Sequence, residues 1–332
     1  MAAEPSLHRA LAEGRDAAAG AVQAVDTVLK APAAATVAHA GYAAVTGDDA
    51  ARQDGLPGVA PKPLLTIRAS SRWALNLREV WRFRDLLVAL AWRDVKLRYR
   101  QTALGVAWVV LQPLMAAGIF SFVFGKVANL SSEGVPYFLF SFAGLLAWNV
   151  FSGVTSKAGV CLVGNSQLVS KVYFPRMILP LSAVLSCLLD VCIALSVLVV
   201  LMAAWGVPPG RGLLLLPVWS LMIVMTATGA ALFVSALTVS YRDVQYVLPV
   251  FLQCLLYASP VAYGLSAVPA PYRTLYALNP LVGPLEGFRW SLLGTGQLDF
   301  AHLAYAGAFS LAALTVGILG FSHMQKRFAD VI

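Results

Sequence analysis

Charged residues are scarce in this 332-residue chain: Asp, Glu, Lys and Arg make up 12% of it, against about a quarter in an ordinary soluble protein. The hydrophobic share is 59%, and the mean hydropathy is +0.74. Too few polar side chains remain to cover the surface of a soluble globule of this size. The composition therefore predicts an all-α membrane protein with several spans.

Motifs for catalysis, metal binding and nucleotide binding are also lacking. The four cysteines show no CxxC spacing and lie in apolar runs, which excludes a disulfide scaffold. The four histidines are too dispersed for a metal site. The nearest approach to a phosphate-binding loop, Gly118 to Lys126, has the wrong spacing and no following Ser or Thr. We therefore expect no catalytic residue, metal or cofactor in this chain.

The positive charges are unevenly placed. Of the 24 Lys and Arg residues, 14 lie at or before Arg100, ahead of the first long apolar segment. The predicted outer loops hold only Lys126, Arg211, Arg273 and Arg289. Such asymmetry orients a membrane protein with its positive loops inside. It predicts two cytoplasmic termini, and it argues against nucleic acid as the partner of the basic residues.

Four zones follow along the chain. Residues 1–66 are alanine-rich and are predicted to form a mobile cytoplasmic extension, with docking on a partner as the alternative. Residues 67–102 contain a predicted helix over 78–100 that lies in the membrane interface, with lipid on one face and protein on the other. Residues 103–324 form the membrane domain, and 325–332 a cytoplasmic tail.

Six apolar segments reach the roughly 20 residues needed to cross a bilayer. They are residues 104–127, 137–158, 177–205, 213–239, 244–264 and 300–322. Pro249 and Pro260 interrupt the fifth. Two shorter stretches before the last span, PYRTLYALNP and LVGPLEGFRWSLLG, are predicted to be re-entrant or interfacial helices.

Asp190 is the one carboxylate inside a predicted span. An acidic side chain within a membrane is a functional candidate by default. No Arg, Lys or His is expected in a neighbouring span, which disfavours coupling to protons or sodium. We expect a structural, hydrogen-bonded role, with a position lining a polar path as the alternative.

Four blocks of the chain resemble one family. They are WRDVKLRYRQTALGVAWVVLQPL, VPYFLFSFAGLLAWNVF, LVGNSQLVSKVYFPR and YRDVQYVLPVFLQ…ASPVAY…LNPLVGPLEGFRW. In this order they resemble the ABC-2 type permeases that export polysaccharides such as O-antigen, capsule and teichoic acid. The resemblance covers about residues 76–324 and leaves the N-terminal extension unexplained.

The resemblance implies a six-helix permease in a bacterial inner membrane, with an amphipathic interface helix and two short periplasmic gate helices. It implies a homodimer that works with two copies of a separate ATPase subunit, which binds ATP and Mg. The implied substrate is a polyprenyl-diphosphate-linked polysaccharide, most closely of the O-antigen type.

The inner loop between the second and third spans matches the family's ATPase-coupling loop. The residues carried over are Val163, Gly164, Asn165, Leu168, Lys171, Tyr173, Phe174, Pro175 and Arg176. The alternative is an ordinary basic inner loop, but such a loop does not need the aromatic pair Tyr173 and Phe174.

Basic residues before the first span lie where the family admits its lipid-linked substrate. They are Arg82, Arg93, Lys96, Arg98 and Arg100. Guanidinium groups bind phosphate oxygens in pairs. The alternative is that these cations set the topology or bind anionic membrane lipid.

The segment before the last span matches the periplasmic gate. Its residues are Tyr272, Tyr276, Asn279, Pro280, Glu286, Arg289 and Trp290, and Glu286 can pair with Arg289 at i, i+3. An aromatic belt is the alternative for Trp290. Candidates for lining the path of the sugar are Trp108, Phe120, Trp148, Phe151 and Tyr257, although most aromatic residues in a bundle serve packing.

Two other functions stay open. The same superfamily contains exporters of small hydrophobic molecules, which the inner and outer blocks disfavour. A membrane-embedded glycolipid enzyme would need catalytic residues in its outer loops, where the only acids are Glu133, Glu286 and Asp299.

Overall fold

The computed structural model describes residues 77–99, 107–296 and 300–328. The chain divides into two units, Met1–Ala74 and Leu75–Ile332, and all described residues belong to the second. The predicted extension over residues 1–66 therefore lies outside the described residues, as does Arg100.

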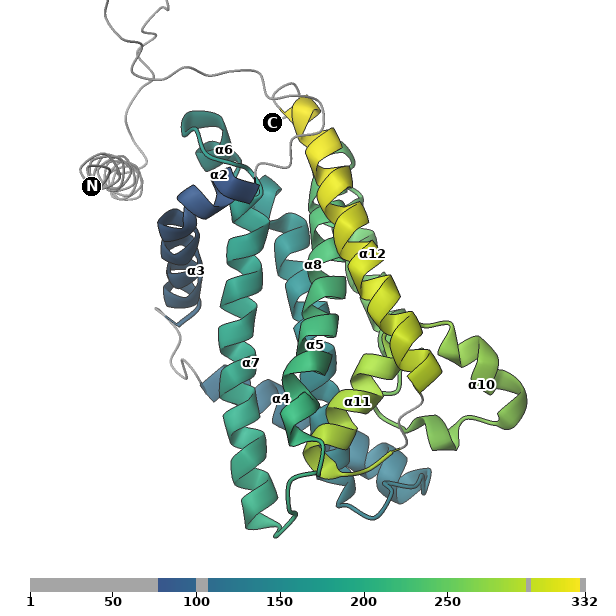
Figure 1. Cartoon of the computed structure of the whole chain (residues 1–332). Helices are drawn as coiled ribbons and strands as arrows, with labels where there is room; N and C mark the ends of the chain where they lie inside the picture. Colours follow the sequence, from purple (N-terminus) through teal and green to yellow (C-terminus); the bar gives the residue numbers. More distant parts are fainter. Residues whose placement is uncertain (1–76, 100–106, 297–299, 329–332) are drawn as a thin grey trace, which may run out of the picture. The chain divides into compact units, whose positions relative to one another are not determined.

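Every regular element in the described residues is a helix, as the composition predicts (Figure 1). Five are long and apolar enough to cross a membrane. They are α4 (Ala107–Phe120) with its π-helical continuation η2 (Ser121–Val127), α5 (Tyr137–Gly164), α7 (Ile178–Ala204), α8 (Leu216–Ser240) with the preceding η3 (Leu213–Leu215), and α12 (Phe300–Met324). The chain is a multi-pass α-helical membrane protein.

The fifth predicted span is shorter than expected. Helix α9 (Val244–Tyr257) has 14 residues and contains Pro249. At 1.5 Å per residue it is about 21 Å long, less than the roughly 30 Å of a hydrocarbon core. The membrane crossing predicted for residues 244–264 therefore stays a prediction.

Helices α5 and α8 form the centre of the bundle. Both are largely buried, whereas α4, α7 and α12 expose most of their apolar surface. Gly229 of α8 and Gly317 of α12 let these two backbones meet, because a side chain on Gly317 would strike the carbonyl oxygen of Gly229. Beside them, Thr226 donates a hydrogen bond to the hydroxyl of Ser310 over 2.9 Å.

The basic region before α4 forms two helices, α2 (Leu77–Arg82) and α3 (Arg84–Tyr99). Leu86 and Leu90 are buried, whereas Trp81 and Trp92 are exposed, so α3 has the two predicted faces. The prediction placed this helix in the membrane interface, with protein on one face and lipid on the other. Helix α3 packs along α7 (Figure 1), because its buried leucines need an apolar partner, and its position in the interface stays a prediction.

Short helices mark the two ends of the bundle. Helix α6 (Ser166–Lys171) connects α5 to α7, and we call its end of the bundle the α6 end. Helices α10 (Ala270–Ala277) and α11 (Val282–Leu293) follow the short η4 (Leu265–Ala267) at the opposite, α10 end (Figure 1). Helices α10 and α11 were both predicted as short helices.

Helix α11 is buried along nearly its whole length and packs against α5, α8 and α12. The indole of Trp219 in α8 donates a hydrogen bond to the hydroxyl of Ser291 over 2.7 Å. The helix ends at Gly294, whose φ of +71° is the left-handed conformation that glycine adopts without strain. By contrast α10 has no buried residue.

Candidate functional site

The connection from α5 to α7 combines anchored and exposed residues. Helix α5 extends to Gly164, so Val163 and Gly164 lie in its last turn. Asn165 then donates to the carbonyl of Cys161 over 2.8 Å and accepts a hydrogen bond from Arg93 over 3.0 Å. The end of α5 is thereby tied to α3.

Apolar side chains hold the rest of this connection against the bundle. Val169 and Phe174 are buried in a small hydrophobic cluster, and Leu168 packs on it. Pro175 is half-buried and starts the turn that leads into α7. Arg176 donates to the carbonyl of Gln325 over 2.7 Å, and its guanidinium lies 5.7 Å from the centre of the Phe328 ring.

Lys171 and Tyr173 are among the exposed side chains of this anchored connection, together with Gln167 and Ser170. Tyr173 is 66% exposed. Partial desolvation, together with the neighbouring Glu79 carboxylate and a hydrogen bond to it, raises the pKa of the Tyr173 phenol above its ordinary value. The phenol is therefore protonated at neutral pH and can donate a hydrogen bond.

The basic residues of α2 and α3 fall into two groups. Arg82 and Lys96 are exposed, and the Lys96 ammonium lies 5.8 Å from the centre of the Trp92 ring. Arg93 pairs with Asp94 over 2.8 Å, and Arg98 pairs with Asp190. The structure thus commits two of the predicted phosphate-binding arginines to carboxylates, while the other two cations face outward.

Asp190 has basic partners, and the expectation that it has none in a neighbouring span is wrong. It pairs with Arg98 of α3 and with Lys157 of α5, the latter over 2.8 Å. The predicted span over 137–158 ended one residue after Lys157, but α5 continues seven residues beyond Lys157. Asp190 lies twelve residues into α7, about 18 Å from its start. Three helices therefore share one carboxylate deep within the bundle.

A second ion pair lies at the α10 end. Glu286 and Arg289 of α11 pair over 2.9 Å, as their spacing predicts, and their side chains are 9% and 1% exposed. Glu286 also accepts a hydrogen bond from the backbone N–H of Leu265 over 2.9 Å. Arg289 donates to the carbonyl of Pro260 over 2.7 Å and lies 4.0 Å from the centre of the Phe140 ring. The pair joins α11 to the segment between α9 and α10.

The other predicted gate residues surround this pair without forming one cluster. Asn279 donates to the carbonyl of Ala258 and to the hydroxyl of Ser259. Burial, followed by the neighbouring Tyr263, raises the pKa of the Tyr276 phenol. Tyr272 is exposed, while Pro280 and Trp290 are half-buried. Their role as a gate stays a prediction.

The five aromatic candidates for the sugar path lie in different surroundings. Trp148 and Phe151 are buried in the core, with ring centres 5.6 Å apart. Phe120 is half-buried and makes an edge contact with Phe124. Trp108 and Tyr257 are exposed. In the single chain, only exposed rings are available to face a path along the surface of the bundle.

No group of three or more His, Cys, Asp or Glu side chains that could hold a metal ion occurs within the described ranges. Sequence reasoning missed Lys157 and Asp94 as ion-pair partners, and it missed Phe140 beneath Arg289. Helical periodicity indicates which residues share a face, but it does not indicate which helices meet.

The arrangement defines a polytopic membrane protein with an anchored connection at one end and short packed helices at the other. The chain belongs to the ABC-2 type transporter family, which matches residues 85–293. Members of this family are membrane subunits of transporters that work with a separate ABC ATPase subunit, so the chain is a transporter subunit and not an enzyme.

Several similar proteins carry names. The O-antigen export system permease protein RfbA of Klebsiella pneumoniae is 26% identical over 249 residues, covering 75% of this chain and 95% of the relative. RfbA of Myxococcus xanthus is 29% identical over 259 residues, 77% of this chain and 98% of the relative. The polysialic acid transport protein KpsM of Escherichia coli is 25% identical over 236 residues, 69% of this chain and 90% of the relative.

Proposed function

We propose that this chain is the membrane subunit of an ATP-driven exporter that moves a lipid-linked polysaccharide of the O-antigen type across a bacterial inner membrane. The observation that carries the proposal is the similarity to two O-antigen export permeases over 95% and 98% of their lengths. A capsular polysaccharide is the second candidate, because the polysialic acid transport protein matches over 90% of its length.

In the proposed assembly, two copies of the chain form the path and two ATPase subunits bind ATP and Mg. Both chain termini and the α6 end face the cytoplasm, in accord with the placement of positive charge. The connection over residues 163–176 is the ATPase contact. Its buried Val169 and Phe174 transmit force to α5 and α7, while Lys171 and Tyr173 touch the partner.

The polyprenyl diphosphate end of the substrate enters beside α3. Arg82 and Lys96 are the exposed residues among the predicted phosphate-binding cations that the structure describes, and they attract the anionic diphosphate group. The sugar chain passes between the two permease copies and leaves at the α10 end, where α10 and α11 form the gate. Covalent chemistry takes place only in the ATPase.

The first test of this function is deletion of the gene. Surface polymer should disappear, and lipid-linked polymer should accumulate inside the cell until the wild-type gene is restored. Composition analysis of the trapped polymer separates the O-antigen type from the capsular type. Unchanged surface polymer in the deletion strain would contradict the proposal.

A second test addresses the ATPase contact. Lys171→Glu combined with Tyr173→Ala changes exposed side chains and leaves the buried anchors in place, so the protein should insert normally. We expect loss of export and loss of ATPase co-purification. The matched control, Arg211→Glu, reverses an exposed charge at the α10 end and should keep the ATPase bound. Equal ATPase recovery from all three proteins would place the contact elsewhere.

A further inference from the structure

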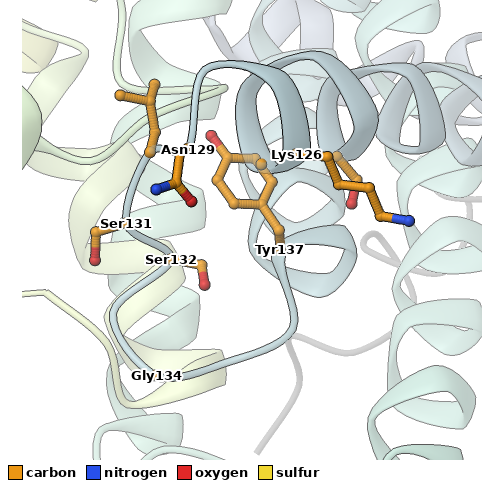
Figure 2. A pocket seen from close by; sticks show the side chains of 9 residues that line it. Lys126, Asn129, Ser131, Ser132, Gly134 and Tyr137 are labelled. Atoms are coloured by element: carbon orange, nitrogen blue, oxygen red, sulfur yellow. The ribbon is translucent and has the colours of Figure 1, made fainter.

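An open pocket of about 580 Å³ lies at the α10 end, where the first long helix turns into the second. It is formed by η2, the loop over 128–136 and the first residue of α5 (Figure 2). None of the predicted site residues lines it. Its labelled side chains are Lys126, Asn129, Ser131, Ser132 and Tyr137.

The local backbone that builds this pocket is unusual. Residues Ser121–Val127 form a π-helix, and Ala128 donates to the carbonyl of Val123 over 2.8 Å. Such wide turns are rare and often occur at functional sites. Asn129 then has a φ of +51°, a left-handed conformation that asparagine adopts more readily than most residues.

A tyrosine ring forms the aromatic wall of the pocket. Figure 2 shows the Tyr137 ring between Asn129 and Lys126. A side chain on Gly125 would lie 2.8 Å from this ring, so the glycine makes room for it. The Tyr137 hydroxyl donates to the carbonyl of Ala262 over 2.6 Å, which fixes the orientation of the ring.

The remaining lining offers neutral hydrogen-bonding groups. Ser132 donates to the carbonyl of Val135 over 2.6 Å, and its oxygen keeps free acceptor capacity. Ser131 accepts from the backbone N–H of Glu133 over 3.2 Å, and its hydroxyl proton stays available. The Glu133 carboxylate accepts a hydrogen bond from Ser266 over 2.7 Å, and Glu133 is not among the residues that line the pocket.

We propose that this pocket binds a pyranose unit of the exported glycan at the exit of the transporter. A pyranose ring has an apolar C–H face that packs on an aromatic ring and an edge of hydroxyls that exchange hydrogen bonds with amides and hydroxyls. Tyr137 supplies the aromatic face, and Asn129, Ser131 and Ser132 supply the polar partners. The inference rests on the proposed function, since that function brings sugar to this end of the chain.

The test is a binding titration on the purified permease–ATPase complex. The probe is the oligosaccharide released by mild acid from the surface polymer of the producing strain. We expect Asn129→Ala and Tyr137→Leu each to weaken binding by about tenfold, the usual effect of losing one well-placed contact. Arg211→Gln removes an exposed charge outside the pocket, so it should bind like the wild type.

Three results would overturn the inference. One is equal affinity of the wild type, Asn129→Ala and Tyr137→Leu for the oligosaccharide. Another is no binding of the oligosaccharide to the wild type, and the third is Lys126-dependent binding of phosphatidylglycerol vesicles in its place. If Tyr137→Leu fails to fold, Asn129→Ala decides the matter, because Asn129 lies exposed on a loop.

Export in the deletion strain separates this inference from the proposed function. If deletion abolishes export while the pocket variants bind sugar as the wild type does, only the pocket assignment is wrong. If deletion leaves surface polymer unchanged, the proposed function is wrong, and the pocket loses its assigned ligand with it.

Discussion

The two ion clusters of the membrane domain are built in opposite ways. Glu286 and Arg289 lie three residues apart on one helix, with side chains 9% and 1% exposed. Asp190 meets Arg98 and Lys157 from two other helices, 92 and 33 residues away along the chain, and these three side chains are 17–36% exposed. The first cluster is local and buried, and the second joins distant segments and is partly exposed.

This difference indicates what each cluster does. A buried ion pair is costly unless further contacts compensate its desolvation. The contacts to Leu265, Pro260 and Phe140 compensate part of that cost, while Nε and Nη1 of Arg289 are buried without a hydrogen-bond partner among the described residues. The pair therefore stabilises one packed arrangement at the α10 end. The Asp190 cluster instead holds α3 to α5 and α7, and it is less enclosed than the Glu286–Arg289 pair.

The largest expected effect on stability comes from breaking the buried Glu286–Arg289 pair. Arg289→Met leaves the Glu286 carboxylate buried without its cation, which costs about 3–5 kcal/mol. We expect a strongly lowered apparent melting temperature in detergent and little protein in the membrane. Adding Glu286→Gln to the same protein should recover part of the loss. A single variant as stable as the wild type would show that the pair does not stabilise the α10 end.

A smaller effect is expected at the distant cluster. Asp190→Asn removes the carboxylate that Arg98 and Lys157 share, and we expect a loss of about 1–3 kcal/mol because the site is less enclosed than the Glu286–Arg289 pair. The melting temperature should fall less than in Arg289→Met, and protease cleavage near α3 should become faster. Adding Lys157→Met should restore part of the stability. Full stability and full export in Asp190→Asn would show that the charge is dispensable.

The smallest effects come from replacing each arginine with lysine, which keeps the charge and removes the planar fork. Arg98→Lys should lower the free energy of unfolding by less than about 1 kcal/mol, because the Arg98–Asp190 pair is partly exposed and the new ammonium keeps the charge. Arg289→Lys should cost more, because one ammonium cannot keep the contacts to Glu286, Pro260 and Phe140 together. Equal shifts of the melting temperature in the two variants would contradict the proposed distinction between a buried cluster and a partly exposed one.

Local sequence signals predicted much of the fold. Apolar segment length identified five long helices, proline placement marked the weak one, and i, i+3 spacing predicted the Glu286–Arg289 pair. These features depend on neighbours within one or two turns, which a linear pattern contains. A helix with two different faces before the first span was predicted for the same reason.

Fewer features of the candidate site could be predicted from the sequence. The segment over 163–176 was located, but nothing in it distinguishes the buried Phe174 from the exposed Tyr173, which are adjacent. The partners of Asp190 were missed because Lys157 lay at the very end of the predicted span over 137–158, whereas α5 continues to Gly164. The pocket around Tyr137 was missed because a π-helix and a left-handed Asn129 carry no strong sequence signal.

The sequence by itself determined that this is an all-α membrane protein and where its helices approximately lie, because apolar content and helical period are local quantities. Only the tertiary structure decided that α3 follows α7, that three helices share Asp190, and that Gly125 makes room for the Tyr137 ring. Each of these depends on which side chains meet across the bundle, and that depends on packing between segments far apart in the chain.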